Sequence, residues 1–235
     1  MAAARGIARA SKEVQVSMTM LRTIAAVILS VLALTGCSST PRDMLMERGE
    51  VAYEAGQYNV AADNFQQVVD RYGGDWQANY YLGKTRLALD EPNAAQIALA
   101  VAHTRKPNNV EVADSLAEAL FRQGREEQLF EFLRERATTQ QTVHAYLRWA
   151  MYSLEMGDPD SAKLAVDTAI RIDRGRSVAP YLAAADLAER VGDRRTALLR
   201  LRQAYTVDPD DELVKDRLLA MGEIPGPTLA APLGR

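Results

Sequence analysis

The sequence is poor in the residues that build most catalytic and metal sites. Its 235 residues include one cysteine and two histidines, so an intrachain disulfide and a cysteine-based zinc site are excluded and a histidine-rich metal site is disfavoured. Lys plus Arg number 28 against 31 for Asp plus Glu, and this lack of a basic excess argues against a nucleic-acid-binding protein. Aromatic residues make up only 6%, but hydrophobic residues reach 48%, which predicts a folded chain over most of its length.

No sequence motif supplies the missing chemistry. The glycine pair Gly73-Gly74 is not followed by the Lys-Ser/Thr of a phosphate-binding loop, and neither G-x-S-x-G nor H-E-x-x-H occurs. His103 and His144 have no second ligand nearby in the sequence, so a surface or packing role is favoured over a catalytic or metal-binding one. We therefore expect a protein that is not an enzyme and that holds no metal and no cofactor.

The N-terminal region has the layout of a secretory signal. Residues 24–34 form an apolar run of 11 residues, too short to cross a bilayer, which needs about 20. Basic residues precede the run, the last being Arg22, as in a signal peptide. The run ends in the tetrapeptide LTGC at 34–37, which resembles the bacterial lipobox. The alternative is a buried apolar helix that ends by chance in a cysteine.

The lipobox resemblance divides this region into two parts. It implies that residues 1–36 are a signal peptide removed by cleavage, and that residues 37–41 are the lipidated Cys37 and a short tether. The acyl chains would make a lipid bilayer one partner of the chain. Ser38 stands where many inner-membrane lipoproteins have Asp, so the resemblance favours an outer-membrane lipoprotein facing the periplasm over an inner-membrane one. The start of translation stays open between three methionines, Met1, Met18 and Met20.

Small residues recur through the rest of the chain at steps of 33 to 35 residues. One series is Gly49, Gly83, Ala117, Ala150 and Ala185, and a second is Ala61, Ala95, Leu129, Ala162 and Ala197. A helix-turn-helix unit of this length with small residues at these places resembles the tetratricopeptide repeat. The resemblance implies an all-α, right-handed superhelical solenoid over residues 42–221. Its five repeats are 42–75, 76–109, 110–142, 143–177 and 178–211, with a capping helix at 211–221.

Two segments depart from the regular pattern. In repeat three, Leu129 and Arg136 stand where the family has Ala, and a polar stretch follows at 138–142. We expect the helix over 127–137 to pack irregularly, or repeat three to be simply divergent. The tail at 222–235 is rich in Pro and Gly and is predicted to be disordered.

The family resemblance also places a partner-binding surface. In tetratricopeptide repeats the first helix of each repeat lines a concave groove, which suits a helical or extended peptide. The candidate binding residues mapped in this way are Tyr53, Tyr80, Lys84, Asp114, Glu118, Phe121, Leu147 and Met151. The acids among them predict a partner segment of basic character. The alternative is that some of these side chains pack between repeats.

The combination of a lipobox and tetratricopeptide repeats resembles the lipoproteins of type IV and Tad pilus systems. It implies a membrane-anchored periplasmic scaffold that binds a protein and assists assembly of an envelope machine. Two alternatives stay open. One is a lipoprotein that regulates outer-membrane biogenesis or peptidoglycan enzymes, and the other is an accessory protein that binds a glycan or peptide.

Overall fold

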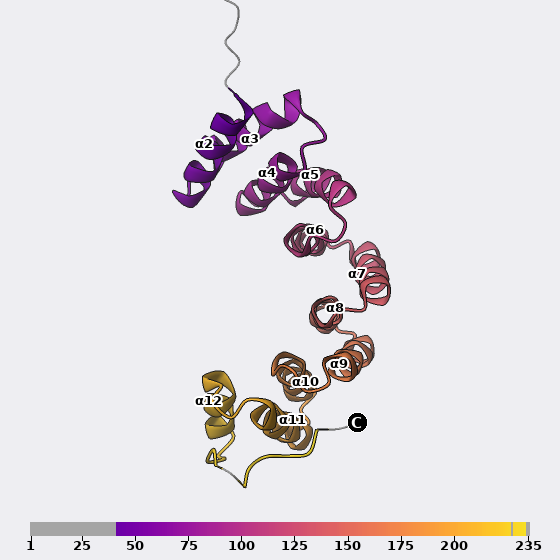
Figure 1. Ribbon diagram of the computed structural model, residues 1–235. Coiled ribbons are helices and arrows are strands. Elements are labelled where there is room, and N and C mark those ends of the chain that lie inside the picture. Colours follow the sequence, from indigo (N-terminus) through magenta and orange to yellow (C-terminus); the bar gives the residue numbers. More distant parts are fainter. Residues whose placement is uncertain (1–40, 227, 234–235) are drawn as a thin grey trace, which may run out of the picture. The chain divides into compact units, whose positions relative to one another are not determined.

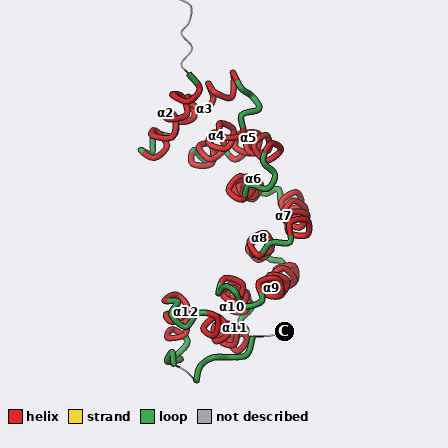
Figure 2. The backbone as a smooth tube through the Cα atoms, viewed as in Figure 1, coloured by secondary structure: helices red, strands yellow, loops and turns green. Residues whose placement is uncertain are grey.

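The computed structural model describes residues 41–226 and 228–233. The predicted signal peptide at 1–36, Cys37 and the tether before Pro41 lie outside these residues. The described part of the chain forms eleven helices and no strand (Figure 2). These helices are α2 (Arg42–Glu54), α3 (Tyr58–Arg71), α4 (Trp76–Ala88), α5 (Pro92–Arg105), α6 (Val110–Arg122), α7 (Glu126–Gln140), α8 (Val143–Glu155), α9 (Pro159–Asp173), α10 (Ala179–Arg190), α11 (Arg194–Val207) and α12 (Glu212–Ala220).

The helices begin where the sequence provides a cap. Asp75, Asn109 and Thr142 precede the first helices of repeats two, three and four, and each side chain accepts a hydrogen bond from a backbone N–H of the first turn. Pro92 and Pro159 open second helices, where the missing N–H costs no hydrogen bond. The helix pairs follow the predicted repeats, and the all-α repeat solenoid is confirmed.

The chain divides into two units after Leu45, and the repeats are described for the second unit, residues 46–235. Within this unit each helix packs mainly against the helices before and after it. In Figure 1, α4, α6, α8 and α10 lie along one side and α5, α7, α9 and α11 along the other. We call these sides the first-helix surface and the second-helix surface, since they are formed by the first and second helix of each repeat.

The small residues of the first series allow the two helices of a repeat to approach closely. A Cβ built on Gly83 would lie 2.8 Å from Leu99 Cδ2, and one built on Gly49 would lie 2.7 Å from Phe65 Cζ. Both distances are too short for real carbon atoms, so any larger residue would push the helices apart. Leu99 and Phe65 are fully buried and fill the space that the missing side chains leave.

Repeat three is the least regular. Its second helix runs to Gln140, so the prediction that it ends at residue 137 is wrong: Thr138 and Thr139 continue the helix, which ends at the left-handed Gln141. Leu129 is fully buried in place of the usual alanine. Helices α6 and α7 approach each other less closely than the helix pairs of repeats two, four and five. This looser packing fits both expectations for repeat three, irregular packing and simple divergence.

The C-terminal tail, for which the sequence predicts disorder, contacts α11 where it is described, at residues 222–226 and 228–233. Ala231 exchanges hydrogen bonds with the hydroxyl of Thr206, at 2.9 Å from its N–H and 2.8 Å to its carbonyl oxygen. Gln203 Nε2 donates to the Pro232 carbonyl at 2.8 Å. Leu229 is buried in the core. The described tail forms no helix, and the buried Leu229 together with the side chains of Gln203 and Thr206 holds it against α11.

The capping helix α12 covers the last repeat with part of its apolar face. Val214 and Leu218 are fully buried, whereas Leu213 and Leu219 are 57% and 54% exposed. Two of these four apolar side chains therefore pack against the last repeat, and two remain largely exposed. No helix in the described part of the chain is long and apolar enough to cross a membrane.

Candidate functional site

The first-helix surface carries two open grooves. The N-terminal groove has a volume of about 570 Å³ and joins α2, α4, α6 and α8. Its walls are formed by Tyr53, Tyr58, Lys84, Leu87, Ala88, Asp114, Ser115, Glu118, Arg122 and Arg148. Four of the residues predicted from the sequence, Tyr53, Lys84, Asp114 and Glu118, are thus brought together here.

Lys84 is held between two aromatic rings at one end of this groove. Its Nζ lies 5.1 Å from the ring centre of Tyr53 and 5.4 Å from that of Tyr80. Both distances are those of cation–π contacts. Burial, with a smaller effect of Glu111, raises the pKa of Tyr80, so its hydroxyl stays protonated and can donate a hydrogen bond. The predicted residue Tyr80 therefore supports Lys84 beside the groove.

The two acids of the N-terminal groove are already paired. The Asp114 carboxylate lies 3.1 Å from His144 Nε2, within hydrogen-bond distance, and forms an ion pair with Arg148 Nε at 3.2 Å. Arg148 therefore takes up much of the negative charge that the sequence had assigned to the groove. A partner would not meet Asp114 as a free carboxylate.

Glu118 is paired in the same way. Its Oε1 accepts from Arg122 Nε at 2.6 Å and its Oε2 accepts from the Tyr152 hydroxyl at 3.0 Å. Tyr152 is 2% exposed, and burial and then the charge of Glu118 raise the pKa of its hydroxyl. A basic partner segment would therefore compete with Arg122 and Arg148 for these two carboxylates, and the basic character of the partner stays a prediction.

Phe121 lies outside the groove wall. Its ring packs on that of Tyr152 with centres 5.3 Å apart, yet 37% of the residue is exposed. The contact with Tyr152 positions the ring, and more than a third of the residue stays exposed. Both of the roles considered for Phe121, packing and presentation, are combined in one side chain.

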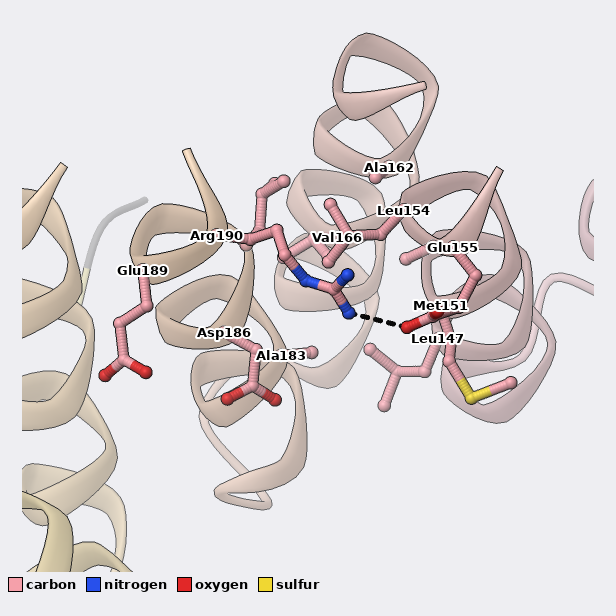
Figure 3. A pocket seen from close by; sticks show the side chains of 12 residues that line it. Leu147, Met151, Leu154, Glu155, Ala162, Val166, Ala183, Asp186, Glu189 and Arg190 are labelled. Carbon is pink, nitrogen blue, oxygen red and sulfur yellow. Dashed lines mark hydrogen bonds and ion pairs between the residues drawn. The ribbon is translucent and has the colours of Figure 1, made fainter. Parts of the chain in front are cut away.

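The C-terminal groove lies between α8, α9 and α10 and has a volume of about 520 Å³. Figure 3 shows its residues: Leu147, Met151, Leu154 and Val166 form an apolar part, and Arg190 reaches across the opening to Glu155. The Arg190 Nη2–Glu155 Oε1 distance is 2.6 Å. Met151 is 39% exposed. The predicted residues Leu147 and Met151 both line this groove in repeat four, whereas the other candidates lie in repeats one to three.

Further acids of this groove, Asp186 and Glu189, are tied to the capping helix. Arg217 of α12 donates to Asp186 Oδ1 at 2.6 Å and to Glu189 Oε1 at 2.9 Å. The capping helix therefore neutralises the far wall of the C-terminal groove as well as covering the last repeat.

The residues that sequence reasoning missed share a simple spacing. Asp114 and Arg148, like Glu118 and Tyr152, are 34 residues apart, one more than the step of 33 between repeats three and four, so each pair lies one position away from equivalent places in consecutive repeats. Side chains at or beside equal places on adjacent first helices are neighbours in a stacked repeat. Looking for opposite charges about one repeat apart would have found Arg148.

The grooves offer no metal-binding cluster among the described residues. In the part of the chain that the structure describes, no group of three or more His, Cys, Asp and Glu side chains could hold a metal ion. What the grooves offer a ligand is exposed apolar surface bordered by ion pairs, which suits binding of a polypeptide segment.

Several solved structures have the same architecture. PilW, described as a widely conserved type IV pilus biogenesis factor, matches with a TM-score of 0.58 and 16% identity, over 87% of this chain and 96% of that chain. A thermophilic tetratricopeptide-repeat protein of Thermus thermophilus matches with a TM-score of 0.53 and 20% identity, over 77% and 98%. YrrB, described as such a repeat protein with an unusual peptide-binding site, matches with a TM-score of 0.52 and 14% identity, over 80% and 96%.

These likenesses establish the fold of the chain as that of tetratricopeptide-repeat proteins, and at such identities they establish the fold alone. No protein-family model matches the chain, and no curated protein matches its sequence.

Proposed function

We propose that the chain is a membrane-anchored periplasmic scaffold that binds a segment of a partner protein along its first-helix surface. The observation that carries this proposal is the pair of open grooves, in which Met151 is exposed, Leu147 and Leu154 are half-buried, and the acids Asp114, Glu118 and Glu155 are paired with arginines. Paired ions keep their hydrogen bonds when a ligand excludes water, so covering them costs less than covering free charges. Exposed Met and aromatic side chains in such a setting are typical binding anchors.

The partner segment is expected to be amphipathic. An apolar side chain fits the space between Leu147, Met151 and Leu154, while polar groups reach the ion pair of Glu155 and Arg190. Because Asp114 and Glu118 are neutralised, recognition depends on apolar contact more than on a basic charge of the partner.

The anchor and the biological setting are part of the same proposal. The lipobox at 34–37 supports attachment through Cys37 to the outer membrane, facing the periplasm. The fold shared with PilW supports a role in pilus or secretion assembly, in which a scaffold on the membrane holds a subunit in place.

Site-specific photo-crosslinking tests the binding surface. A photo-reactive amino acid at Met151, in the groove, is expected to crosslink a membrane or periplasmic protein in the native cell. The matched control is Leu164, which is 59% exposed on α9 of the same repeat but belongs to the second-helix surface. Crosslinks formed equally at both positions, or at Leu164 alone, would contradict the proposed surface.

An affinity measurement follows once the crosslinked protein has been identified by mass spectrometry. Truncating an anchor that fills a groove typically weakens binding by about 1–2 kcal/mol or more, so Met151→Ala is expected to raise Kd about 10-fold or more. Leu164→Ala should leave Kd unchanged. The identity of the partner decides between pilus assembly and the other envelope processes.

The anchor is tested separately from the groove. Mass spectrometry of the protein from membranes is expected to show an acylated N-terminal Cys37, and Cys37→Ser should leave the precursor uncleaved. An unmodified Cys37 thiol within an uncleaved wild-type chain would refute the anchor and would leave the binding surface untouched.

A further inference from the structure

Arg136 is a buried cation that lacks a partner for half of its guanidinium group. The residue is 8% exposed and lies on α7, in the irregular repeat three. Its Nη1 donates to the Pro107 carbonyl at 3.0 Å, while Nη2 is buried and has no hydrogen-bond partner. Asp114, which attracts it from a distance, is already paired with His144 and Arg148. Burial lowers the pKa of the Arg136 guanidinium, as expected for a charge held away from water.

The repeat does not require a cation at this position. The residues that occupy the same place in the other four repeats are small, apolar and buried: Val68, Ala102, Ala169 and Ala204. A buried charge without a counter-ion destabilises the folded chain. Arg136 therefore lowers the stability of repeat three, a loss that the apolar residues at this position spare the other repeats. A cost of this kind is typical of a residue that meets an anion in another state of the protein.

A cavity of about 190 Å³ lies at this residue on the second-helix surface. It is lined by His103, Pro107, Asn108, Phe132, Glu135, Arg136, Thr139 and Gln140. Most small-molecule sites exceed about 300 Å³, so this space holds a single side chain or the end of a chain. The rings of His103 and Phe132 meet edge to face at 5.2 Å and give the cavity one apolar wall.

The polar side chains around the cavity favour an anion. Asn108, Thr139 and Gln140 carry hydrogen-bond donors, and the Gln140–Asn108 contact is long, at 3.4 Å, so it can give way to a stronger acceptor. Burial and the nearby Arg136 lower the pKa of His103, which leaves a neutral ring that can also donate. Glu135 is exposed beside the cavity and repels a doubly charged ligand such as phosphate more than a carboxylate.

We propose that this cavity binds a carboxylate of a partner polypeptide, with Arg136 as the cationic group and Asn108, Thr139 and Gln140 as neutral donors. Because Arg136 forms part of the cavity wall, a rotation of its guanidinium brings Nη2 to a carboxylate in the cavity while the side chain stays buried. Guanidinium–carboxylate contacts are among the strongest hydrogen bonds in proteins. The site is lined by residues of α5, of α7 and of the loop after α5, and these two helices belong to the second-helix surface (Figure 1). It shares no lining residue with the two grooves, so it is separate from them.

Three short peptides distinguish the two sources of a carboxylate. Acetyl-Gly-Gly-Phe offers a free C-terminus, its C-terminal amide offers none, and acetyl-Gly-Glu-Gly-amide offers an acidic side chain. Each is titrated into the full chain while the backbone amide signals of Asn108, Thr139 and Gln140 are followed by NMR. Saturable shifts with the first peptide and none with its amide identify a C-terminal carboxylate, and shifts with the third identify an acidic side chain. Equal shifts with the free acid and its amide, or no saturable shift with any peptide, would overturn the proposal.

Substitutions then test whether the guanidinium binds the carboxylate. Arg136→Met keeps the length of the side chain and removes the charge, so it should weaken binding of the active peptide by about 10-fold or more. Since it also removes an unpaired buried charge, the unfolding midpoint should stay equal or rise. The matched control, Arg134→Met on the exposed side of the same helix, should change neither.

A second substitution covers the case in which Arg136→Met disturbs folding. Asn108→Ala removes a donor from an exposed loop and should weaken the same peptide several-fold at an unchanged unfolding midpoint. Unchanged affinity in Asn108→Ala together with unchanged affinity, or loss of fold, in Arg136→Met would assign Arg136 a structural role and overturn the site. Either result leaves the proposed scaffold function standing, because that is read at Met151.

Discussion

Gly83→Ala gives a direct measure of how tightly the helices of repeat two are packed. Alanine in place of glycine within a helix normally stabilises it by about 1 kcal/mol. Here the new Cβ would lie 2.8 Å from Leu99 Cδ2, and overpacking of a filled core costs about 1–3 kcal/mol. Packing therefore outweighs helix propensity, and we expect a net loss of about 1 kcal/mol in the free energy of unfolding.

The sign of the effect should reverse when Leu99 is shortened. Leu99→Ala alone leaves a cavity and should cost about 2–5 kcal/mol. In that background the Cβ at residue 83 meets open space, so adding Gly83→Ala should recover about 1 kcal/mol. Urea unfolding followed by far-UV circular dichroism of the four chains gives both numbers. If Gly83→Ala stabilises the otherwise unchanged chain by the full propensity difference, the close approach of α4 and α5 is refuted.

Three further predictions concern the turns between helices, the contact of the C-terminal tail and a helix cap. Asp90 has φ +59° in the turn where other repeats place glycine, so Asp90→Gly should raise the free energy of unfolding by about 1 kcal/mol. Gly124→Ala in the equivalent turn should lower it by a similar amount. Unfolding midpoints that move the other way would contradict the turn geometry. Thr206→Val removes the hydroxyl that binds Ala231, so it should lower the free energy of unfolding by about 1 kcal/mol and speed amide hydrogen exchange at the end of α11. Unchanged exchange would show that the tail is not held there. Asp158 accepts hydrogen bonds from Ser161, which lower the pKa of Asp158, so the stability that its ionised form adds is present above pH 3.8, the ordinary value, and is lost as the pH falls below it. Asp158→Ala should therefore cost about 1 kcal/mol at pH 7 and less near pH 3. A cost that does not change with pH would argue against the ionised cap.

The repeat was readable from the sequence because its spacing is a packing requirement. Gly49 and Gly83 can be nothing larger beneath Phe65 and Leu99, so the period of 34 survives in residues that face the interior. The helix ends depend instead on single residues, since caps and prolines act locally. Asp90 stands in the turn where other repeats have glycine, and the sequence analysis did not predict its left-handed conformation.

The candidate site was less predictable because it depends on pairs of side chains. The positions of Asp114 and Glu118 on the first-helix surface followed from the repeat, whereas their charge state in the groove depends on Arg148 and Arg122. The contact of the tail depends on such a pair as well. Its composition indicates the absence of a helix, but its contact with α11 depends on Thr206, about 25 residues earlier.

The loose pairing of α6 and α7 has a consequence for how the protein responds to force and heat. A linear array separates at its weakest interface, so α2–α6 and α7–α12 should behave as two cooperative blocks. The polar contacts of Asp114 and Glu118 with α8 connect the two blocks. Salt weakens such charged contacts, whereas a peptide bound across them in the N-terminal groove would strengthen the connection between the blocks. We therefore expect the free protein to unfold in two thermal steps. These steps should merge into one as a peptide fills the N-terminal groove, so the shape of the calorimetric transition would report how much of the protein is bound.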